Sequence, residues 1–221
     1  MTDFTFDAIS RKIEGVSRAD VLNFEDSREV GWRDANEQIS KFEYLIAMIK
    51  RNVRFVPVNF RILDVGCGTA DLYCYLSQTD RKYDYTGIDL VKESIRKAQK
   101  RYPELKKKLI VGDFLDHEFK QKFDVVVANG LFHWKGQIDE KVYLEYVQNV
   151  IKKMFELSKY GVVFNMITPA PSFFNPDQFY VRDFHSFFVF LYGLTRQVEI
   201  STSYPAWDVN IGLFKNRYVA L

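Results

Sequence analysis

Residues 62–76 read ILDVGCGTADLYCYL, an apolar run followed by two glycines one residue apart and then by an apolar helical periodicity. The run Arg61–Val65 predicts a short buried strand, and a helix is expected from about Thr69 to Ser77. The two glycines let the backbone turn sharply between these elements, and the N-terminus of a helix offers unpaired N–H groups to a ligand. The stretch therefore predicts a strand, a ligand-binding loop and a helix.

Strands and helices continue to alternate along the rest of the chain. The expected strands are 83–88, 108–111, 123–128, 161–167, 197–203 and 209–215, and the expected helices are 39–49, 91–102, 138–157 and 183–192. Because only five residues separate the last two strands, these two can pair only antiparallel. The expected fold class is α/β, with a Rossmann-like, seven-stranded, mostly parallel sheet, helices on both faces, a C-terminal antiparallel hairpin and an N-terminal helical cap.

The length of 221 residues fits one core, and a hydrophobic content of 47% is ample to form it. We expect a helical cap at 1–58 and one compact binding domain at 59–221, with an aromatic lid inserted at about 168–185. The balance of 31 basic and 29 acidic residues is too near neutral for a protein dedicated to coating nucleic acid or a membrane surface. No feature of the sequence indicates an oligomeric state.

Three further observations bear on the cellular setting. The first residues, MTDFTFDAISRK, carry acid where a signal peptide carries base, and the most apolar segment, 184–195, is shorter than the roughly 20 residues of a spanning helix. Two cysteines and three histidines are too few for a disulfide framework or a four-ligand zinc site. We therefore expect a cytoplasmic protein without a metal ion or membrane attachment.

Acidic side chains around the glycine loop indicate the ligand. Asp64 precedes the loop, and Asp71 stands where a dinucleotide-binding loop has Gly or Ala; two carboxylates repel a pyrophosphate but suit an ammonium group. Asp89, at the end of the second strand, is placed to accept hydrogen bonds from ribose hydroxyls. Asp113 and Phe114 follow the third strand, where they can meet the amino edge and the face of an adenine. Amino acid, ribose and adenine in this order make up S-adenosylmethionine.

The chain resembles the class I S-adenosylmethionine-dependent methyltransferases. The stretches that carry the resemblance are ILDVGCGTADLYCYL (62–76), YTGIDL (85–90), VGDF (111–114), FDVVVANGLF (123–132) and GVVFNMI (161–167). The resemblance implies S-adenosylmethionine as cofactor and S-adenosylhomocysteine as product. The cofactor-binding residues that it implies are Asp64, Gly66, Cys67, Gly68, Asp71 and Leu72 for the methionine part, Asp89 and Leu90 for the ribose, Asp113 and Phe114 for the adenine, and Asn129, Gly130 and Leu131 near the sulfonium.

The segment 31–38, GWRDANEQ, with Phe42 resembles the entrance helix of a bacterial small-molecule subgroup of these enzymes. We expect Trp32 and Arg33 to close over the methionine end of the cofactor, with Arg33 pairing with its carboxylate. Two of the implied residues have simpler alternatives. Asp71 can instead stabilise the first turn of its helix by its charge, and Cys67 is better explained as a small loop residue than as a nucleophile.

The acceptor side is expected at the loop after the fourth strand, NGLFHW (129–134). Enzymes that methylate amino groups of bases resemble one another in an Asn/Asp-Pro-Pro-aromatic signature here, and this chain lacks both prolines, which disfavours a nucleic-acid acceptor. We expect His133 to act as general base in O-methylation of a small molecule, the alternative being a loop histidine that only bonds nearby backbone. The other residues expected on the acceptor side are Trp134, Phe174, Tyr180 and His185.

Two rival functions remain open at this point. Eight basic residues between Lys92 and Lys108 could contact RNA phosphates in a tRNA methyltransferase, although a solvated helix face explains them more simply. The second rival is a non-catalytic relative that binds the cofactor or a partner protein through its aromatic C-terminal region.

Overall fold

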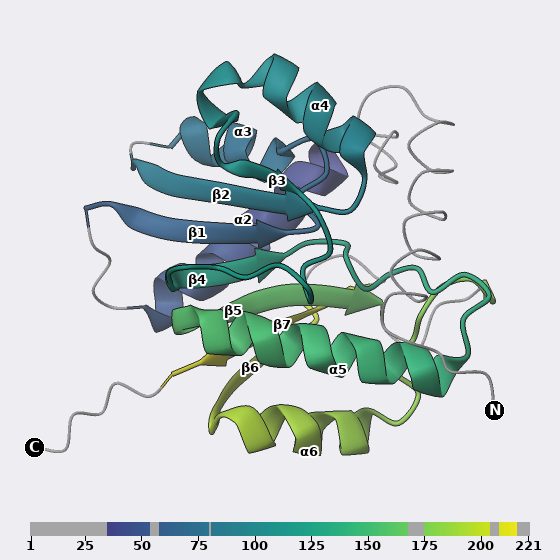
Figure 1. Cartoon of the computed structure of the whole chain (residues 1–221). Helices are drawn as coiled ribbons and strands as arrows, with labels where there is room; N and C mark the ends of the chain where they lie inside the picture. Colours follow the sequence, from purple (N-terminus) through teal and green to yellow (C-terminus); the bar gives the residue numbers. More distant parts are fainter. Residues whose placement is uncertain (1–34, 54–57, 80, 168–174, 204–207, 216–221) are drawn as a thin grey trace, which may run out of the picture.

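The computed structural model describes residues 35–53, 58–79, 81–167, 175–203 and 208–215. Within them, seven strands form one sheet in the order β3-β2-β1-β4-β5-β7-β6 (Figure 1). The strands are β1 (Phe60–Val65), β2 (Tyr83–Asp89), β3 (Leu109–Val111), β4 (Phe123–Ala128), β5 (Ser158–Ile167), β6 (Gln197–Ser201) and β7 (Asp208–Phe214). The first five pair in parallel, whereas β7 pairs antiparallel with both β5 and β6. The expected α/β sheet with a C-terminal antiparallel hairpin is confirmed.

Helices cover both faces of this sheet (Figure 1). The helices are α2 (Ala35–Asn52), α3 (Asp71–Ser77), α4 (Lys92–Arg101), α5 (Glu140–Leu157) and α6 (Phe184–Leu194), with a short 3-10 turn, η2 (Pro103–Leu105). Apolar side chains of α2, α3 and α4 form one core layer, and those of α5 and α6 form the other. Every residue of β4 is buried between the two layers, as its sequence FDVVVA predicts for a central strand. None of the described helices is both long and apolar enough to cross a membrane.

Several elements begin at residues other than those expected; helix α2, for example, begins at Ala35 rather than Ile39. Helix α3 begins at Asp71 rather than near Thr69, because Gly68 and Ala70 have φ angles of 52° and 63°, in the left-handed region that a helix cannot use. Strand β5 begins at Ser158 rather than Gly161, because Ser158 follows α5 directly and already pairs with Phe123 of β4.

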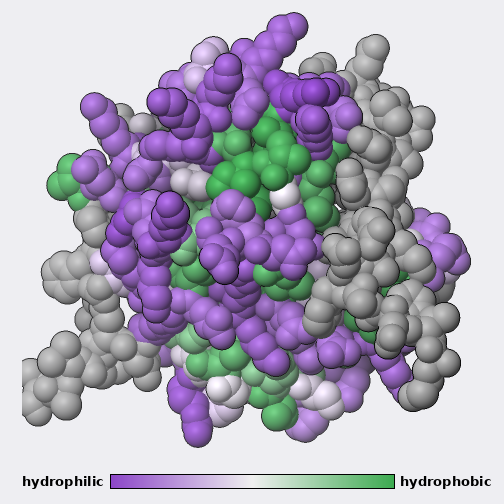
Figure 2. Space-filling view, viewed as in Figure 1, coloured by the Kyte–Doolittle hydropathy of each residue, from purple (hydrophilic) through white to green (hydrophobic). Residues whose placement is uncertain are grey.

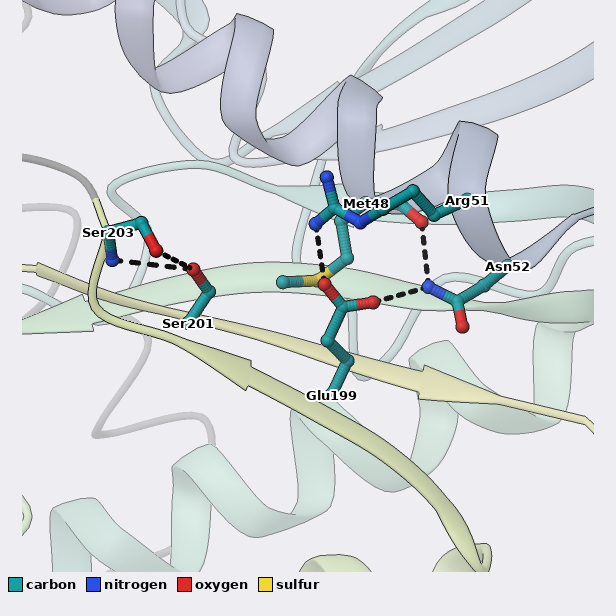
Figure 3. A network of polar contacts seen from close by, with 6 residues as sticks. All are labelled: Met48, Arg51, Asn52, Glu199, Ser201 and Ser203. Atoms are coloured by element: carbon teal, nitrogen blue, oxygen red, sulfur yellow. Dashed lines mark hydrogen bonds and ion pairs between the residues drawn. The ribbon is translucent and has the colours of Figure 1, made fainter.

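Helix α2 is tied to the C-terminal hairpin at its own C-terminal end. Arg51 and Asn52 both donate hydrogen bonds of 2.5 Å to the carboxylate of Glu199 on β6, and Asn52 also donates to the Met48 carbonyl (Figure 3). Met48 lies close to β7, since a Cβ added to Gly212 would stand 2.7 Å from its sulfur. These contacts fix α2 across β6 and β7, so its N-terminal half lies over the start of β7.

The directions of the strands indicate at which edge of the sheet a ligand would bind. The strand order reverses between β1 and β4, and in open α/β sheets ligands bind beyond the carboxyl ends of the strands at such a point. Strand β7 runs in the opposite direction, so its first residue, Asp208, pairs with Ile167 at the end of β5. Residues that follow β1, β2, β4 and β5 therefore share this edge with the beginning of β7.

Candidate functional site

The glycine loop after β1 lies against β2 and the loop after β4. The backbone N–H groups of Gly66 and Cys67 donate to the Ile88 carbonyl at 2.9 and 3.2 Å. Gly66 has a φ of 73°, a conformation that favours glycine, and a Cβ there would stand 2.8 Å from Leu131 Cδ1. The structure thus brings the loop of β1 and Leu131, two parts of the expected site, into contact.

Asp89 is held in place by backbone donors on both sides. Its Oδ2 accepts from Gly68 N at 2.8 Å and its Oδ1 from Val91 N at 2.7 Å. Burial raises the pKa of Asp89 above its usual range, and these two hydrogen bonds act against that rise. Each carboxylate oxygen can accept more than one hydrogen bond, so the fixed carboxylate can still accept from two further hydroxyls.

Asp64 lies buried at the end of β1, on the sheet face covered by α2 and α3. Its Oδ2 accepts a 2.7 Å hydrogen bond from the Tyr85 hydroxyl. The pKa of Asp64 is raised to about 7: burial raises it most, the hydrogen bond from Tyr85 lowers it, and the charges of Asp89 and Asp71 also raise it. A carboxyl group in this state gains a favourable partner when a positively charged group enters the site.

The raised pKa of Asp64 predicts a pH-dependent cost to stability. Because the folded state holds this proton up to about pH 7, against the ordinary pKa of 3.8, the stability from Asp64 is greatest below about pH 4 and is lost as the pH rises to 7. The Asp64→Asn variant keeps an oxygen that can accept the Tyr85 hydrogen bond. Its free energy of unfolding is expected to rise relative to that of the wild type as the pH increases over this range. The gain at pH 8 should be on the order of 2 to 4 kcal/mol.

Urea unfolding between pH 4 and 8 measures this difference. Asp84→Asn, which removes a partly exposed carboxylate on β2, is the matched control and should show little change with pH. A difference between Asp64→Asn and the wild type that stays constant with pH would contradict the assignment.

Asp71 makes its contacts within the protein. Arg101 of α4 approaches its Oδ1 at 2.7 Å, and the Thr69 hydroxyl donates to its Oδ2 at 2.7 Å. Asp71 also stands in the first turn of α3, where a negative charge is stabilising. These contacts favour the helix-stabilising alternative for Asp71 over direct contact with a ligand.

The basic cluster near α4 is a charged outer surface. Arg101 pairs with Asp71, and Lys108 pairs with Asp84. Figure 2 shows that the surface around α4, in the upper part of the view, is mainly hydrophilic. The pairs favour a solvated helix face over an RNA contact as the explanation of this cluster.

The loop after β3 is fastened to α5. Asp113 Oδ1 accepts from Leu115 N at 2.7 Å, and Phe114 is buried. Lys153 of α5 donates to the Leu115 and His117 carbonyls at 2.7 and 2.8 Å and lies 5.4 Å from the centre of the Phe114 ring. The loop that carries the expected adenine contacts is thus held by a lysine that the sequence did not single out.

Tyr146 of α5 also belongs to this part of the site. It is buried, and burial together with the charges of Asp113 and Asp89 raises its pKa above the usual range. The tyrosine therefore lies near both carboxylates expected to meet the nucleoside. From the sequence, Tyr146 could be predicted only as a core residue, because it lies in the apolar stripe of α5.

Asn165 of β5 fixes the loop after β4 by hydrogen bonds. Asn165 is fully buried; its Oδ1 accepts from Gly130 N at 2.7 Å, and its Nδ2 donates to Asn129 Oδ1 at 2.9 Å. The same Nδ2 lies 3.0 Å from Asp208 Oδ2. Sequence reasoning missed Asn165, although a single amide inside the apolar run GVVFNMI is a signal that could have found it.

The segment 175–182 lies on the other side of that loop. Phe179 N donates to the His133 carbonyl at 2.9 Å, and Trp134 forms an isolated antiparallel bridge with Gln178. Tyr180 is buried and donates to Gln178 Oε1 at 2.6 Å. The described part of the expected lid therefore covers the loop that carries His133 and Trp134.

The other expected residues are either outside the described part of the chain or away from these loops. Trp32, Arg33 and Phe174 lie outside the described residues. His185 is exposed in the first turn of α6, close to the helix-capping Asp183. Leu72 is buried in the core beneath α3, and Leu90 packs against the opposite core layer.

His133 lies next to a buried ion pair. Its side chain is largely buried, and its Nε2 is 3.8 Å from Asp208 Oδ1. Lys41 of α2 approaches the other oxygen, Asp208 Oδ2, at 2.7 Å, and both side chains of this pair are buried. Neither Lys41 nor Asp208 was predicted, because a lysine beside the apolar stripe of a helix and an aspartate after a turn are ordinary surface patterns.

The Cys67 thiol is buried in the glycine loop. Burial raises the pKa of the Cys67 thiol well above its ordinary value, which fits a packed loop residue rather than a nucleophile. In the part of the chain that the structure describes, no group of three His, Cys, Asp or Glu side chains is arranged to hold a metal ion.

Comparison with known proteins agrees with this arrangement. Residues 62–154, from β1 to α5, match the family model described as a methyltransferase domain. Over these residues the chain is similar to a methyltransferase domain. The match includes the glycine loop, Asp89, the loop after β3 and the loop after β4.

Two relatives and one solved structure illustrate the similarity. The malonyl-[acyl-carrier protein] O-methyltransferase of Priestia megaterium is 29% identical over 114 residues, 52% of this chain and 41% of the relative. The fatty-acid O-methyltransferase of Mycolicibacterium smegmatis is 33% identical over 93 residues, 42% of this chain and 33% of the relative. This chain therefore spans less than half the length of either relative. The structure of magnesium protoporphyrin IX methyltransferase from Synechocystis with bound S-adenosylhomocysteine shares the fold, with a TM-score of 0.65, 10% identity, and coverage of 96% of this chain and 100% of that one.

Proposed function

We propose that the protein transfers the methyl group of S-adenosylmethionine to an oxygen atom of a small-molecule acceptor. The observation that carries the proposal is the fixed carboxylate of Asp89, which Gly68 N and Val91 N hold at the carboxyl end of β2, beside the loop that follows β1. The methyltransferase-domain match covers the same residues, and the names of the two relatives describe O-methyltransferases.

The residues around the glycine loop fit this cofactor. The buried Asp64 carboxyl suits an ammonium group, and Asp89 retains acceptor capacity for two ribose hydroxyls. The loop of Asp113 and Phe114, which Lys153 fastens to α5, is the expected place of the adenine. When bound, S-adenosylmethionine supplies a methyl group on a positively charged sulfur.

The chain's own part in the reaction is alignment, exclusion of water and proton removal. Asn165 fixes Asn129 and Gly130, and the segment 175–182 covers the same loop from outside. Such fixed surroundings favour the in-line geometry that methyl transfer requires. His133 lies in this loop and is the candidate to take a proton from an acceptor hydroxyl.

The geometry favours a hydroxyl acceptor over a nucleic acid or a carboxylate. A carboxylate has no proton to lose, whereas the buried imidazole beside Asp208 suits an acceptor that does. The loop after β4 lacks the two prolines of base-amino methyltransferases, and two members of the basic cluster pair with aspartates.

Incubation with labelled S-adenosylmethionine and a metabolite extract tests the proposal. We expect label in a small molecule that mass spectrometry identifies as an O-methyl product, and much less label with Asp89→Ala at a limiting cofactor concentration. Label found only in added undigested tRNA would support the RNA methyltransferase instead. Tight binding of the cofactor without any labelled product would support the non-catalytic relative.

A further inference from the structure

We propose that Asp208 is a positioning residue for His133, and that Lys41 and Asn165 hold Asp208 in the orientation for this task. The inference deepens the proposed function and rests on it, because it concerns how His133 accepts the proton of the acceptor. It assigns a role to three buried polar residues that come from α2, β5 and β7.

The contacts of Asp208 divide between its two oxygens. Oδ2 lies 2.7 Å from Lys41 Nζ and 3.0 Å from Asn165 Nδ2, and Oδ1 lies 3.8 Å from His133 Nε2. Two donors on one oxygen fix the plane of the carboxylate, so the second oxygen is directed at the imidazole. A separation of 3.8 Å is longer than a hydrogen bond, and hydrogen bonds of catalytic bases commonly shorten when substrate is in place.

The burial of these residues argues against a purely structural role. Lys41 is 5% exposed and Asp208 is 4% exposed. Taking both charges out of water is costly, and well-packed apolar side chains commonly stabilise a protein at least as much as a buried ion pair does. The neighbouring residues of α2, Phe42 and Leu45, show that apolar packing on this sheet face is available to the helix.

A second buried polar group extends this layer. Asn210 of β7 pairs with Asn165 in the sheet register and is 1% exposed. No described residue hydrogen-bonds to either amide atom of its side chain. The sheet beneath the N-terminal half of α2 therefore carries a continuous polar layer, maintained against the cost of its burial.

Asp208 and Lys41 both influence the transfer of the acceptor's proton to His133. The O–H bond of the acceptor breaks and its proton passes to an imidazole nitrogen of His133. The acceptor oxygen forms a bond to the methyl carbon as the C–S bond breaks, and the electron pair of that bond goes to sulfur. Asp208 stabilises the imidazolium that results, and Lys41 moderates this effect so that the proton can leave again.

The other charged side chains on the contacting loops are engaged locally. Lys135, in the same loop as His133, donates to the carbonyls of Gly136 and Ile138. Asp177, in the covering segment, accepts from Gln137 at 2.5 Å. Asp208 of β7 lies 3.8 Å from His133 Nε2, and Lys41 of α2 pairs with the same Asp208 carboxylate.

The pKa of His133, measured by NMR titration, tests the proposal without any acceptor. The chain has three histidines, and His133→Gln identifies the signal. We expect Asp208→Asn to lower the pKa of His133 by about one unit or more, and Lys41→Met to raise it, because the two variants remove opposite charges. Glu199→Gln, which loosens the other attachment of α2 to the hairpin, is the control and should leave the pKa within about 0.3 unit (Figure 3).

Asp208→Asn removes the buried partner of Lys41 and could fail to fold for that reason, so a second comparison is needed. The double variant Lys41→Met/Asp208→Asn removes both charges, and its His133 pKa should lie below that of Lys41→Met alone. A pKa of His133 that does not respond to Asp208 in either background would overturn the proposal, as would an equal change in Glu199→Gln.

Turnover and cofactor binding separate this inference from the proposed function. If methyl transfer occurs, Asp208→Asn should lower kcat and shift its pH profile to lower pH, while calorimetry shows cofactor affinity changed by less than about twofold. The titration pattern without any methyl transfer would reject the proposed function and keep the coupling. Methyl transfer without the titration pattern would reject the coupling alone.

Discussion

Asp89→Ala is expected to weaken S-adenosylmethionine binding by about 10²-fold or more. Hydrogen bonds to a charged group contribute about 1.5 to 3 kcal/mol each, and the ribose is expected to donate two of them. The same carboxylate accepts from Gly68 N and Val91 N, so the variant also removes one of the hydrogen bonds that hold the glycine loop against β2. Isothermal calorimetry with the wild type and the variant measures the loss directly.

Two controls make the result specific. Asp89→Asn keeps one acceptor oxygen and is expected to fall between Asp89→Ala and the wild type. Asp84→Asn removes a carboxylate from the opposite end of β2, where it pairs with Lys108, and should leave the affinity unchanged. Equal affinity of wild type and Asp89→Ala would remove Asp89 from the cofactor site.

The sheet could be predicted from the sequence because its signals are local. Strands such as β1 and β4 are mainly apolar runs of six residues, and helices of clear periodicity separate the parallel strands. The short connection before β7 leaves only antiparallel pairing with β6. The starts of α3 and β5 were less accurate, because they depend on the left-handed conformation of Ala70 and on the pairing of Ser158 with Phe123.

The site could be predicted only where a residue stands at the end of a strand. Asp64, Asp89 and the loop after β4 are at such positions, and the chain order of parallel strands brings them to one edge. The partners of these residues come from distant segments. Arg101 reaches Asp71 from 30 residues away, and Asn165 and Asp208 are separated by 43 residues.

The pairing of β5 with β7 explains why the residues around His133 could not all be predicted from the sequence. Its register places Asp208 opposite Ile167, and Asn210 opposite Asn165, on the face that α2 covers. A one-residue shift of this register would turn Asp208 to the other face of the sheet. The sequence contains these side chains but not the register, so the neighbourhood of His133 became visible only in the fold.

His133→Ala is expected to lower kcat by about 10²-fold or more when the acceptor is a hydroxyl compound. The imidazole lies in the loop that Asn165 and the segment 175–182 hold in place, next to Asp208. Its removal takes away the proton acceptor and leaves the glycine loop and Asp89 intact, so cofactor affinity should change by less than about twofold. Steady-state kinetics and calorimetry on the same preparation measure both quantities.

The pH profile decides whether the loss reflects proton removal. Wild-type turnover should rise with pH as the imidazole loses its own proton, and that rise should be absent in His133→Ala. His185→Ala, at an exposed position of α6, is the control and should retain nearly full turnover. A large loss in His185→Ala instead would move the base to α6. A small loss in both variants would show that the acceptor oxygen carries no proton, as in a carboxylate, and that alignment alone drives the reaction.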